Sequence, residues 1–259
     1  MLHSRHSLPA LVMCLHKVLG TALRPWPPPG RLRGLHSRPA MEADFDCWER
    51  ARVDPDAEFE GATPVRSIFG YGSLIFRPGF PYLRAYPASV RGYLRRFWQR
   101  SCDHRGTPKA PGRVVTLVRA EDAGGEAEAA EVHGVAYDVA DEDWQAVLEA
   151  LDIRERHGYV RTVAALLAPG GASAEAGTGR AVVYYAHEPR SNAAYAGPEA
   201  VAQTAEVIAS SGGPSGRNDD YLFALKSALD EWGIPPDPYL EELVEAVRNS
   251  QLLSRREGD

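Results

Sequence analysis

Short runs rich in β-branched and aromatic residues recur between residues 65 and 186. Such runs, bounded by Gly, Pro and charged residues, are typical of β-strands. The runs are Val65 to Phe69, Val90 to Gln99, Val114 to Arg119, Val132 to Val139, Thr162 to Leu167 and Ala181 to Ala186. The pattern therefore predicts six strands in this part of the chain.

Apolar positions take helical spacing between the fourth and fifth predicted strands and again after residue 198. In the first stretch, Asp141 can cap a helix and Gly158 can end the turn that follows it. The apolar faces consist of Trp144, Val147, Leu148 and Leu151; of Val201, Ala205 and Ile208 after Pro198; of Leu222, Leu225, Leu229 and Trp232 before Gly233 and Pro235; and of Leu240, Leu243, Val244 and Val247. Strands first and helices mainly later predict an α+β fold, with a small mixed sheet or barrel flanked by helices.

The first 64 residues have a different composition from the rest. Met1 to Ala40 contains no Asp or Glu, six Lys or Arg residues, and the run Pro27 to Pro29. An acid-free, Arg-bearing start is similar to an organelle transit segment, but a start at Met41 or a disordered tail would also explain it. We therefore expect an N-terminal extension and linker over residues 1–64, one domain over residues 65–250, and a C-terminal tail over residues 251–259.

Charge, cysteine content and hydropathy argue against several classes of protein. The formal charge of -6 gives no basic footprint for nucleic acid. The three cysteines are scattered, which predicts neither a disulfide framework nor a zinc site, and the histidines lack metal-ligand spacing. The apolar stretch from Leu8 to Leu23 is too short and too polar to span a bilayer. We expect a reducing compartment, no membrane anchor and no metal.

The first predicted strand runs into a loop with two glycines, Gly70-Tyr71-Gly72-Ser73-Leu74. Glycines at a strand end let successive backbone N–H groups converge on an anion such as a carboxylate, although a simple tight turn would look the same. A dinucleotide fingerprint would need a third glycine where Ile75 stands, and a nucleophile elbow would need glycines at positions 71 and 75. Ser73 is therefore expected to donate hydrogen bonds and not to act as a nucleophile.

Glu155 is a second candidate because it directly follows the first predicted helix. A carboxylate can act as general acid and base when burial raises its pKa toward neutrality. Arg154 and Arg156 would oppose that rise if they pointed at it. A solvated ion pair is the alternative interpretation of a Glu between two arginines.

Several blocks in the same order closely resemble the ChaC family of γ-glutamylcyclotransferases. They cover most of the chain from Val65 to about Arg248. The blocks are Phe69 to Ile75, Phe97 to Gln99, Asp103 to Pro108, Pro111 to Leu117, Ile153 to Tyr159 and Gly216 to Leu222. The combination is far more specific than any single block.

The resemblance implies a fold, an activity and a site. The implied fold is a mixed β-barrel with flanking helices, compatible with the six predicted strands. The implied reaction cleaves glutathione to 5-oxoproline and cysteinylglycine without a cofactor. Glu155 would transfer the proton, and the γ-glutamyl moiety would be bound by Gly70, Tyr71, Gly72, Ser73, Leu74 and Ile75. The implied location is the cytosol, with a mitochondrion or plastid as the alternative if residues 1–40 act as a transit segment.

Two other functions remain compatible with the same residues. A related cyclotransferase could prefer other γ-glutamyl amino acids or amines. A non-catalytic protein could keep the loop and bind γ-glutamyl compounds without turning them over, although binding alone does not require Glu155.

Overall fold

The largest element of the fold is a mixed sheet of five strands. The structure is a computed structural model, and it describes residues 64–124, 129–155, 158–167, 179–186 and 192–257. The strand order is β2-β5-β1-β7-β6, and only the pair β1 and β7 is parallel. The strands are β1 (Ser67–Gly70), β2 (Arg84–Arg91), β5 (Glu131–Asp138), β6 (Tyr159–Ala165) and β7 (Arg180–Ala186). Of the predicted extension and linker over residues 1–64, all but Pro64 lies outside the described residues.

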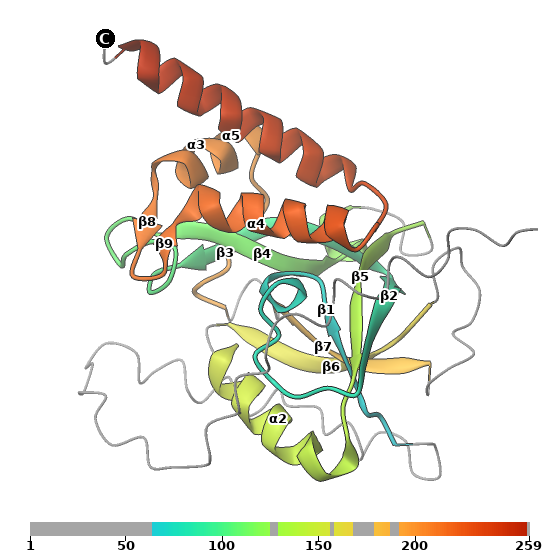
Figure 1. The fold of residues 1–259 in the computed structure, drawn as a ribbon. Coiled ribbons are helices and arrows are strands. Elements are labelled where there is room, and N and C mark those ends of the chain that lie inside the picture. Colours follow the sequence, from blue (N-terminus) through green and yellow to red (C-terminus); the bar gives the residue numbers. More distant parts are fainter. Residues whose placement is uncertain (1–63, 125–128, 156–157, 168–178, 187–191, 258–259) are drawn as a thin grey trace, which may run out of the picture. The chain divides into compact units, whose positions relative to one another are not determined.

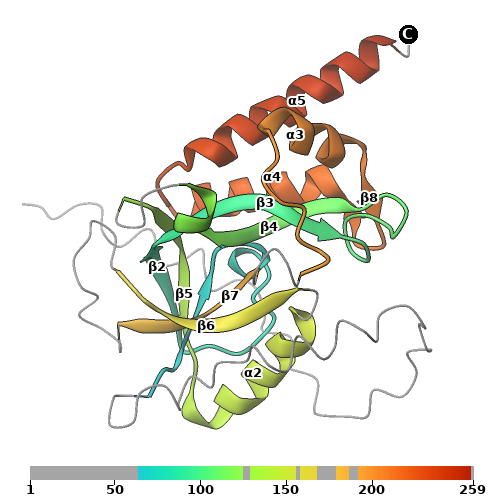
Figure 2. The same ribbon diagram turned by 180° about the vertical axis from the view of Figure 1, so that it is seen from behind.

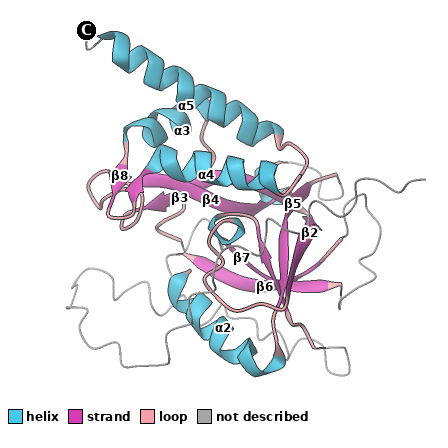
Figure 3. Ribbon diagram, in the orientation of Figure 1, coloured by secondary structure: helices cyan, strands magenta, loops and turns pink. Residues whose placement is uncertain are grey.

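A second layer separates this sheet from most of the helices. β3 (Tyr93–Ser101) and β4 (Gly112–Arg119) form an antiparallel pair, and Figures 1 and 2 show this pair between the large sheet and the helices α3 to α5. Helix α2 lies at the opposite end of the fold, as the colouring by secondary structure in Figure 3 makes clear. The helices are α2 (Asp141–Arg154), α3 (Val201–Ser210), α4 (Asn218–Glu231) and α5 (Pro238–Glu257); the shorter elements are η3 (Ser73–Ile75), η4 (Glu121–Ala123), β8 (Gly212–Gly213) and β9 (Gly216–Arg217).

The predicted α+β class, with a mixed sheet and flanking helices, is confirmed. The barrel is not closed, because the described strands form separate sheets. The predicted strand over Val90 to Gln99 is two strands, which turn at Gly92 with a φ of 82°. Most of β2 was not predicted, and it contains Pro87, a residue that is unfavourable inside a sheet. β2 tolerates this proline because it lies at the edge of the sheet.

The helices occur where the apolar spacing predicts them, but some ends differ. Ala140, and not Asp141, precedes the first turn of α2, and the Asp141 carboxylate instead accepts a hydrogen bond from Arg66. The helix after Pro198 begins at Val201. The expected tail is also shorter, because α5 continues to Glu257. No helix in the described ranges is long and apolar enough to cross a membrane.

The guanidinium of Arg95 on β3 is buried between three elements, with 1% of its side chain exposed. It donates to the backbone oxygen of Tyr71 at 3.2 Å and to that of His133 on β5. It also pairs with the Asp237 carboxylate at 3.0 Å. Asp237 in turn accepts hydrogen bonds from the amides of Tyr239 and Leu240, so it caps α5. This one cation connects the loop after β1, the large sheet and the last helix.

Replacing Arg95 with Met should destabilise the fold by about 3 kcal/mol, because removing one partner of a buried pair leaves the other charge and two carbonyl oxygens without a donor. Urea denaturation would measure the change. Arg84→Gln is the matched control, because the Arg84–Asp138 pair is solvent-exposed on the arginine side and should contribute no more than about 0.5 kcal/mol. Equal losses in the two variants would contradict this role of Arg95.

Candidate active site

The turn after β1 forms one wall of a pocket. β1 ends at Gly70, and Tyr71, Gly72, Ser73 and Leu74 line the pocket. A side chain at Gly72 would not fit, because a Cβ there would lie 2.5 Å from a methyl group of Val115 and 3.4 Å from the Tyr221 hydroxyl. Gly72 is therefore required for the close approach of this turn to β4 and α4.

Backbone N–H groups in this turn are available to a ligand. The turn is closed by hydrogen bonds from the Ile75 amide to the Gly72 oxygen at 3.0 Å and from the Arg77 amide to the Ser73 oxygen at 2.8 Å. Within the described ranges, the amides of Ser73 and Leu74 form no backbone hydrogen bond. Unpaired amides at the start of a helical turn favour a negatively charged group.

Glu155 reaches the same pocket from the C-terminal end of α2, where its amide donates to the Leu151 oxygen at 2.8 Å. Only 18% of its side chain is exposed. Burial raises the pKa of Glu155 above its ordinary value of 4.5, and the nearby Arg154 opposes that rise without cancelling it. The group is therefore a carboxyl whose proton affinity suits proton transfer better than that of a solvated Glu.

Arg154 connects Glu155 to the turn after β1. Its Nε lies 3.2 Å from the Glu155 carboxylate, and its Nη2 donates to the Ser73 hydroxyl at 2.9 Å. Its Nη1 donates to the backbone oxygens of Arg77 and Pro78, both at 2.9 Å. One guanidinium thus binds the Ser73 hydroxyl, two backbone oxygens of the turn after β1 and the Glu155 carboxylate. Arg154 therefore fixes the distance between this turn and Glu155. Arg156 and His157 lie outside the described residues.

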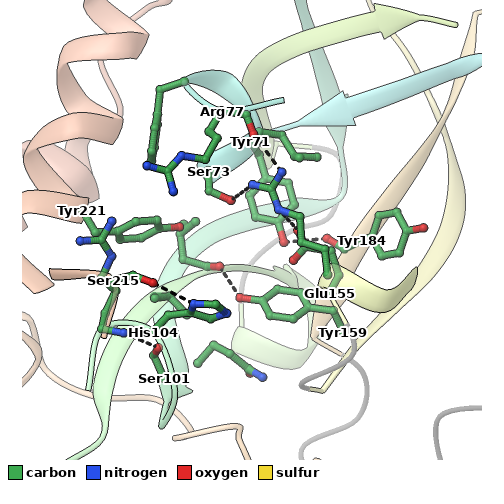
Figure 4. A pocket seen from close by; sticks show the side chains of 18 of the residues that line it. Tyr71, Ser73, Arg77, Ser101, His104, Glu155, Tyr159, Tyr184, Ser215 and Tyr221 are labelled. Atoms are coloured by element: carbon green, nitrogen blue, oxygen red, sulfur yellow. Dashed lines mark hydrogen bonds and ion pairs between the residues drawn. The ribbon is translucent and has the colours of Figure 1, made fainter. Parts of the chain in front are cut away.

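Four tyrosines line the pocket, and three of their hydroxyls donate hydrogen bonds to the protein. Tyr71 donates to the Tyr184 oxygen at 2.6 Å, Tyr159 donates to the Val115 oxygen at 2.6 Å, and Tyr184 donates to the Asp152 carboxylate at 2.8 Å. The Tyr221 hydroxyl, which comes from α4, accepts a hydrogen bond from the Val115 backbone but donates to none of the residues that the structure describes. Burial and the charge of Glu155 raise the pKa of Tyr221, so this hydroxyl keeps its proton and can offer it to a ligand. Figure 4 shows Tyr221 and Glu155 on opposite sides of the pocket.

The structure brings together most of the residues expected from the sequence. Glu155 and the segment from Tyr71 to Leu74 line one pocket. Gly70 and Ile75 do not line it. Gly70 packs against Leu74 and Tyr137, and Ile75 is 4% exposed in the hydrophobic core, so both support the turn from behind.

Sequence reasoning gave no role to several residues of the pocket. Tyr221 and Arg105 lie in two of the blocks that carry the family resemblance, but neither block was connected with the loop or with Glu155. Arg154 was considered only as a neighbouring charge. The resemblance blocks were the available signal, because no local spacing relates positions that lie so far apart in the chain.

The raised pKa of Glu155 has a consequence for stability. The folded protein binds this proton more tightly than the unfolded chain does, so stability falls as pH rises from the ordinary carboxyl value toward the raised pKa. We expect Glu155→Gln to be more stable than the wild type above that range and equally stable below it. Thermal unfolding at several pH values would test this, with Glu149→Gln on the exposed face of α2 as the control. A less stable Glu155→Gln variant at neutral pH would contradict the assignment.

Comparisons with known proteins agree with one another. A family model described as ChaC-like protein matches residues 66–250. The glutathione-specific gamma-glutamylcyclotransferase of Saccharomyces cerevisiae is 36% identical over 219 residues, which cover 70% of this chain and 94% of the relative. Glutathione-specific gamma-glutamylcyclotransferase 1 of Homo sapiens is 38% identical over 198 residues, which cover 74% of this chain and 84% of the relative.

A solved structure supports the same relationship. The crystal structure of the yeast γ-glutamyl cyclotransferase specific to glutathione matches with a TM-score of 0.62 and 35% sequence identity. The match covers 71% of this chain and 98% of the yeast chain. The family model extends over more than half of the sequence, and the pocket lies within the matched residues. This chain belongs to the ChaC-like family.

Proposed function

We propose that this protein is a γ-glutamylcyclotransferase that cleaves glutathione to 5-oxoproline and cysteinylglycine, with Glu155 as the residue that transfers the proton. The observation that carries the proposal is the placement of a buried carboxyl with a raised pKa in the same pocket as the unpaired amides after β1. Relatives with at least 36% identity that are named as glutathione-specific γ-glutamylcyclotransferases support the choice of substrate.

The substrate supplies its own nucleophile. In a γ-glutamyl amide, the α-amine and the γ-carbonyl carbon belong to the same molecule, and attack of one on the other closes a five-membered ring. The pocket has to hold the folded conformer and restrict its motion, an effect that can lower the barrier by several kcal/mol. The reaction therefore needs no Ser or Cys nucleophile from the protein.

One carboxylate is sufficient for both proton transfers. Ionised Glu155 accepts a proton from the α-ammonium group, and the freed amine attacks the γ-carbonyl carbon. As the tetrahedral intermediate collapses, the bond between that carbon and the cysteine nitrogen breaks, and this nitrogen takes the proton held by Glu155. The ring nitrogen then gives its second proton to the regenerated carboxylate, which passes it to the departing amine, so the products are the neutral lactam and an ammonium group. The carboxylate is regenerated in each turnover.

The other polar groups of the pocket suit the negative charges of the substrate. The Ser73 and Leu74 amides can hold the α-carboxylate, because they are free of backbone partners. The Tyr221 hydroxyl can donate to the γ-carbonyl oxygen as negative charge develops on it. A fixed donor of this kind stabilises the transition state more than the ground state, since the charge is largest in the transition state.

We further propose the cytosol as the site of action, following the family resemblance. The acid-free segment over residues 1–40, which would instead direct the protein to an organelle, lies outside the described residues. Subcellular fractionation together with N-terminal sequencing of the native protein distinguishes the two locations, because removal of a transit segment leaves a shortened chain.

Glu155→Gln should lower the rate of 5-oxoproline formation from glutathione by about 10²–10⁴-fold, the usual contribution of a positioned acid–base group. Mass spectrometry of 5-oxoproline and the released amine would measure it, with Glu149→Gln as the control. For the wild type, kcat/KM should rise with pH through the raised pKa of Glu155, because only the ionised form accepts a proton.

Two results would favour a different function. Product from other γ-glutamyl dipeptides but not from glutathione would favour a cyclotransferase of different selectivity. Stabilisation of the protein by glutathione without any product would favour a γ-glutamyl-binding protein, since a ligand that binds only the folded state raises stability.

Tyr221→Phe should lower kcat by about 10²-fold, because one preorganised donor to the developing oxyanion is lost. Tyr159→Phe is the comparison, since its hydroxyl already donates to the Val115 oxygen and is expected to affect stability more than kcat. Steady-state kinetics on glutathione would separate the two. An unchanged kcat in Tyr221→Phe would exclude the hydroxyl from the chemical step.

A further inference from the structure

The pocket has a basic side that the proposed reaction does not use. Arg77, which follows η3, and Arg105, in the loop between β3 and β4, both line it. In Figure 4, Glu155, Tyr159 and Tyr184 lie on one side, and Tyr221, Ser215 and His104 lie on the other. The pocket therefore continues past the reacting groups toward the loop that carries Arg105.

The effects of neighbouring charges on the pKa of Tyr221 indicate where Glu155, Tyr221 and Arg105 lie along the pocket. The Glu155 carboxylate raises the pKa of Tyr221, and Arg105 lowers it, so Tyr221 is close to both charges. The guanidinium of Arg105 also lies over the Tyr221 ring, 5.5 Å from its centre. The pKa of Glu155 itself responds to burial and to Arg154. Tyr221 thus lies between the acid and Arg105.

Arg105 is held in place by its surroundings. Its Nη1 donates to the Arg217 backbone oxygen on β9 at 3.0 Å, and its amide donates to the Ser101 hydroxyl at 2.9 Å. The loop itself packs tightly against β8, because a Cβ at Gly213 would lie 2.5 Å from the backbone oxygens of both His104 and Gly106. A guanidinium positioned in this way loses little freedom when it binds a ligand.

Arg77 and Arg105 line the same pocket, and their positive charges are close enough to interact. Burial lowers the pKa of Arg105, and the positive charge of Arg77 lowers it further. Among the ion pairs of the described residues, none includes either arginine. Asp220 attracts Arg105 from a distance, and Asp103 lies 3.8 Å from His104. Two like charges at one side of a pocket repel each other, and a bound anion would remove that repulsion.

We propose that Arg77 and Arg105 bind the carboxylate of the leaving group, which is the glycine carboxylate of glutathione. This assignment rests on the proposed function. When the γ-glutamyl group lies at the turn after β1 and at Glu155, the dipeptide that leaves extends past Tyr221. Two residues of extended chain reach roughly 7 Å, which carries the terminal carboxylate away from Glu155. A planar guanidinium is well suited to such a carboxylate.

The subsite gives a physical reason for selectivity. Glutathione ends in a carboxylate two residues beyond the γ-glutamyl group, whereas γ-glutamylamines have no carboxylate there. Without that anion the two arginines remain uncompensated, so the pocket would discriminate against substrates that lack it.

The test compares glutathione with glutathione whose glycine carboxylate is a carboxamide. We expect Arg105→Gln and Arg77→Gln to raise KM for glutathione about tenfold and to change KM for the carboxamide by less than about twofold, with kcat nearly constant. The Arg77→Gln variant is expected to fold normally, because Arg77 is exposed and its side chain forms no hydrogen bond with another described residue. Its KM therefore tests the subsite even if Arg105→Gln does not fold. Arg91→Gln, outside the pocket and paired only loosely with Glu131 at 3.8 Å, is the control.

Each other outcome overturns the assignment. Equal losses on both substrates would place the arginines at the α-carboxylate, which the two substrates share. Unchanged KM values for glutathione would remove them from substrate binding altogether. A wild-type protein that makes no 5-oxoproline would refute the proposed function and the subsite together, whereas an active wild type with unaffected variants would refute the subsite alone.

Discussion

The fold around the pocket depends on the buried guanidinium of Arg95. It binds the backbone oxygens of Tyr71 and His133 and the carboxylate of Asp237, which also caps α5. A cation buried this deeply is unfavourable unless all of these acceptors are present. The start of the turn after β1 is thereby fixed relative to the sheet and to the C-terminal helices. The charged group thus lies where the turn after β1, the large sheet and α5 come together.

The pocket uses a second cation in a comparable way. Arg154 binds Ser73 and the oxygens of Arg77 and Pro78, so the turn after β1 and the end of α2 cannot move apart without breaking several hydrogen bonds. Its position also limits how far the pKa of Glu155 rises. The same guanidinium thus influences both the geometry and the proton affinity of the acid.

Much of the fold followed from the sequence, because local patterns determine local elements. The runs of β-branched residues located the predicted strands, and the apolar spacing from Trp144 to Leu151 located α2. β2 was missed because its edge position, which tolerates Pro87, is a property of the whole sheet. A mixed β-barrel was expected by resemblance. The pairing of β3 with β4 apart from the larger sheet was not visible in any one segment of the sequence.

The site was less predictable than the fold. A Glu beside two arginines looks solvated in the sequence, and its burial comes from residues such as Tyr71, Tyr159 and Tyr221 on three other elements. Only the resemblance joined the loop to Glu155. The availability of the Tyr221 proton could not be inferred, since it depends on which of the four tyrosines find an acceptor in the folded chain.

The position of Glu155 also affects what happens after the chemistry. In the proposed reaction this carboxylate faces an ammonium group in the substrate, but ring closure turns that nitrogen into a neutral lactam in 5-oxoproline. The attraction between opposite charges is present before the reaction and absent after it. The α-carboxylate, in contrast, keeps its charge but loses the neighbouring ammonium group of its own molecule. The pocket therefore holds its reactant more tightly than the cyclised product, which favours rapid release and weak inhibition by 5-oxoproline.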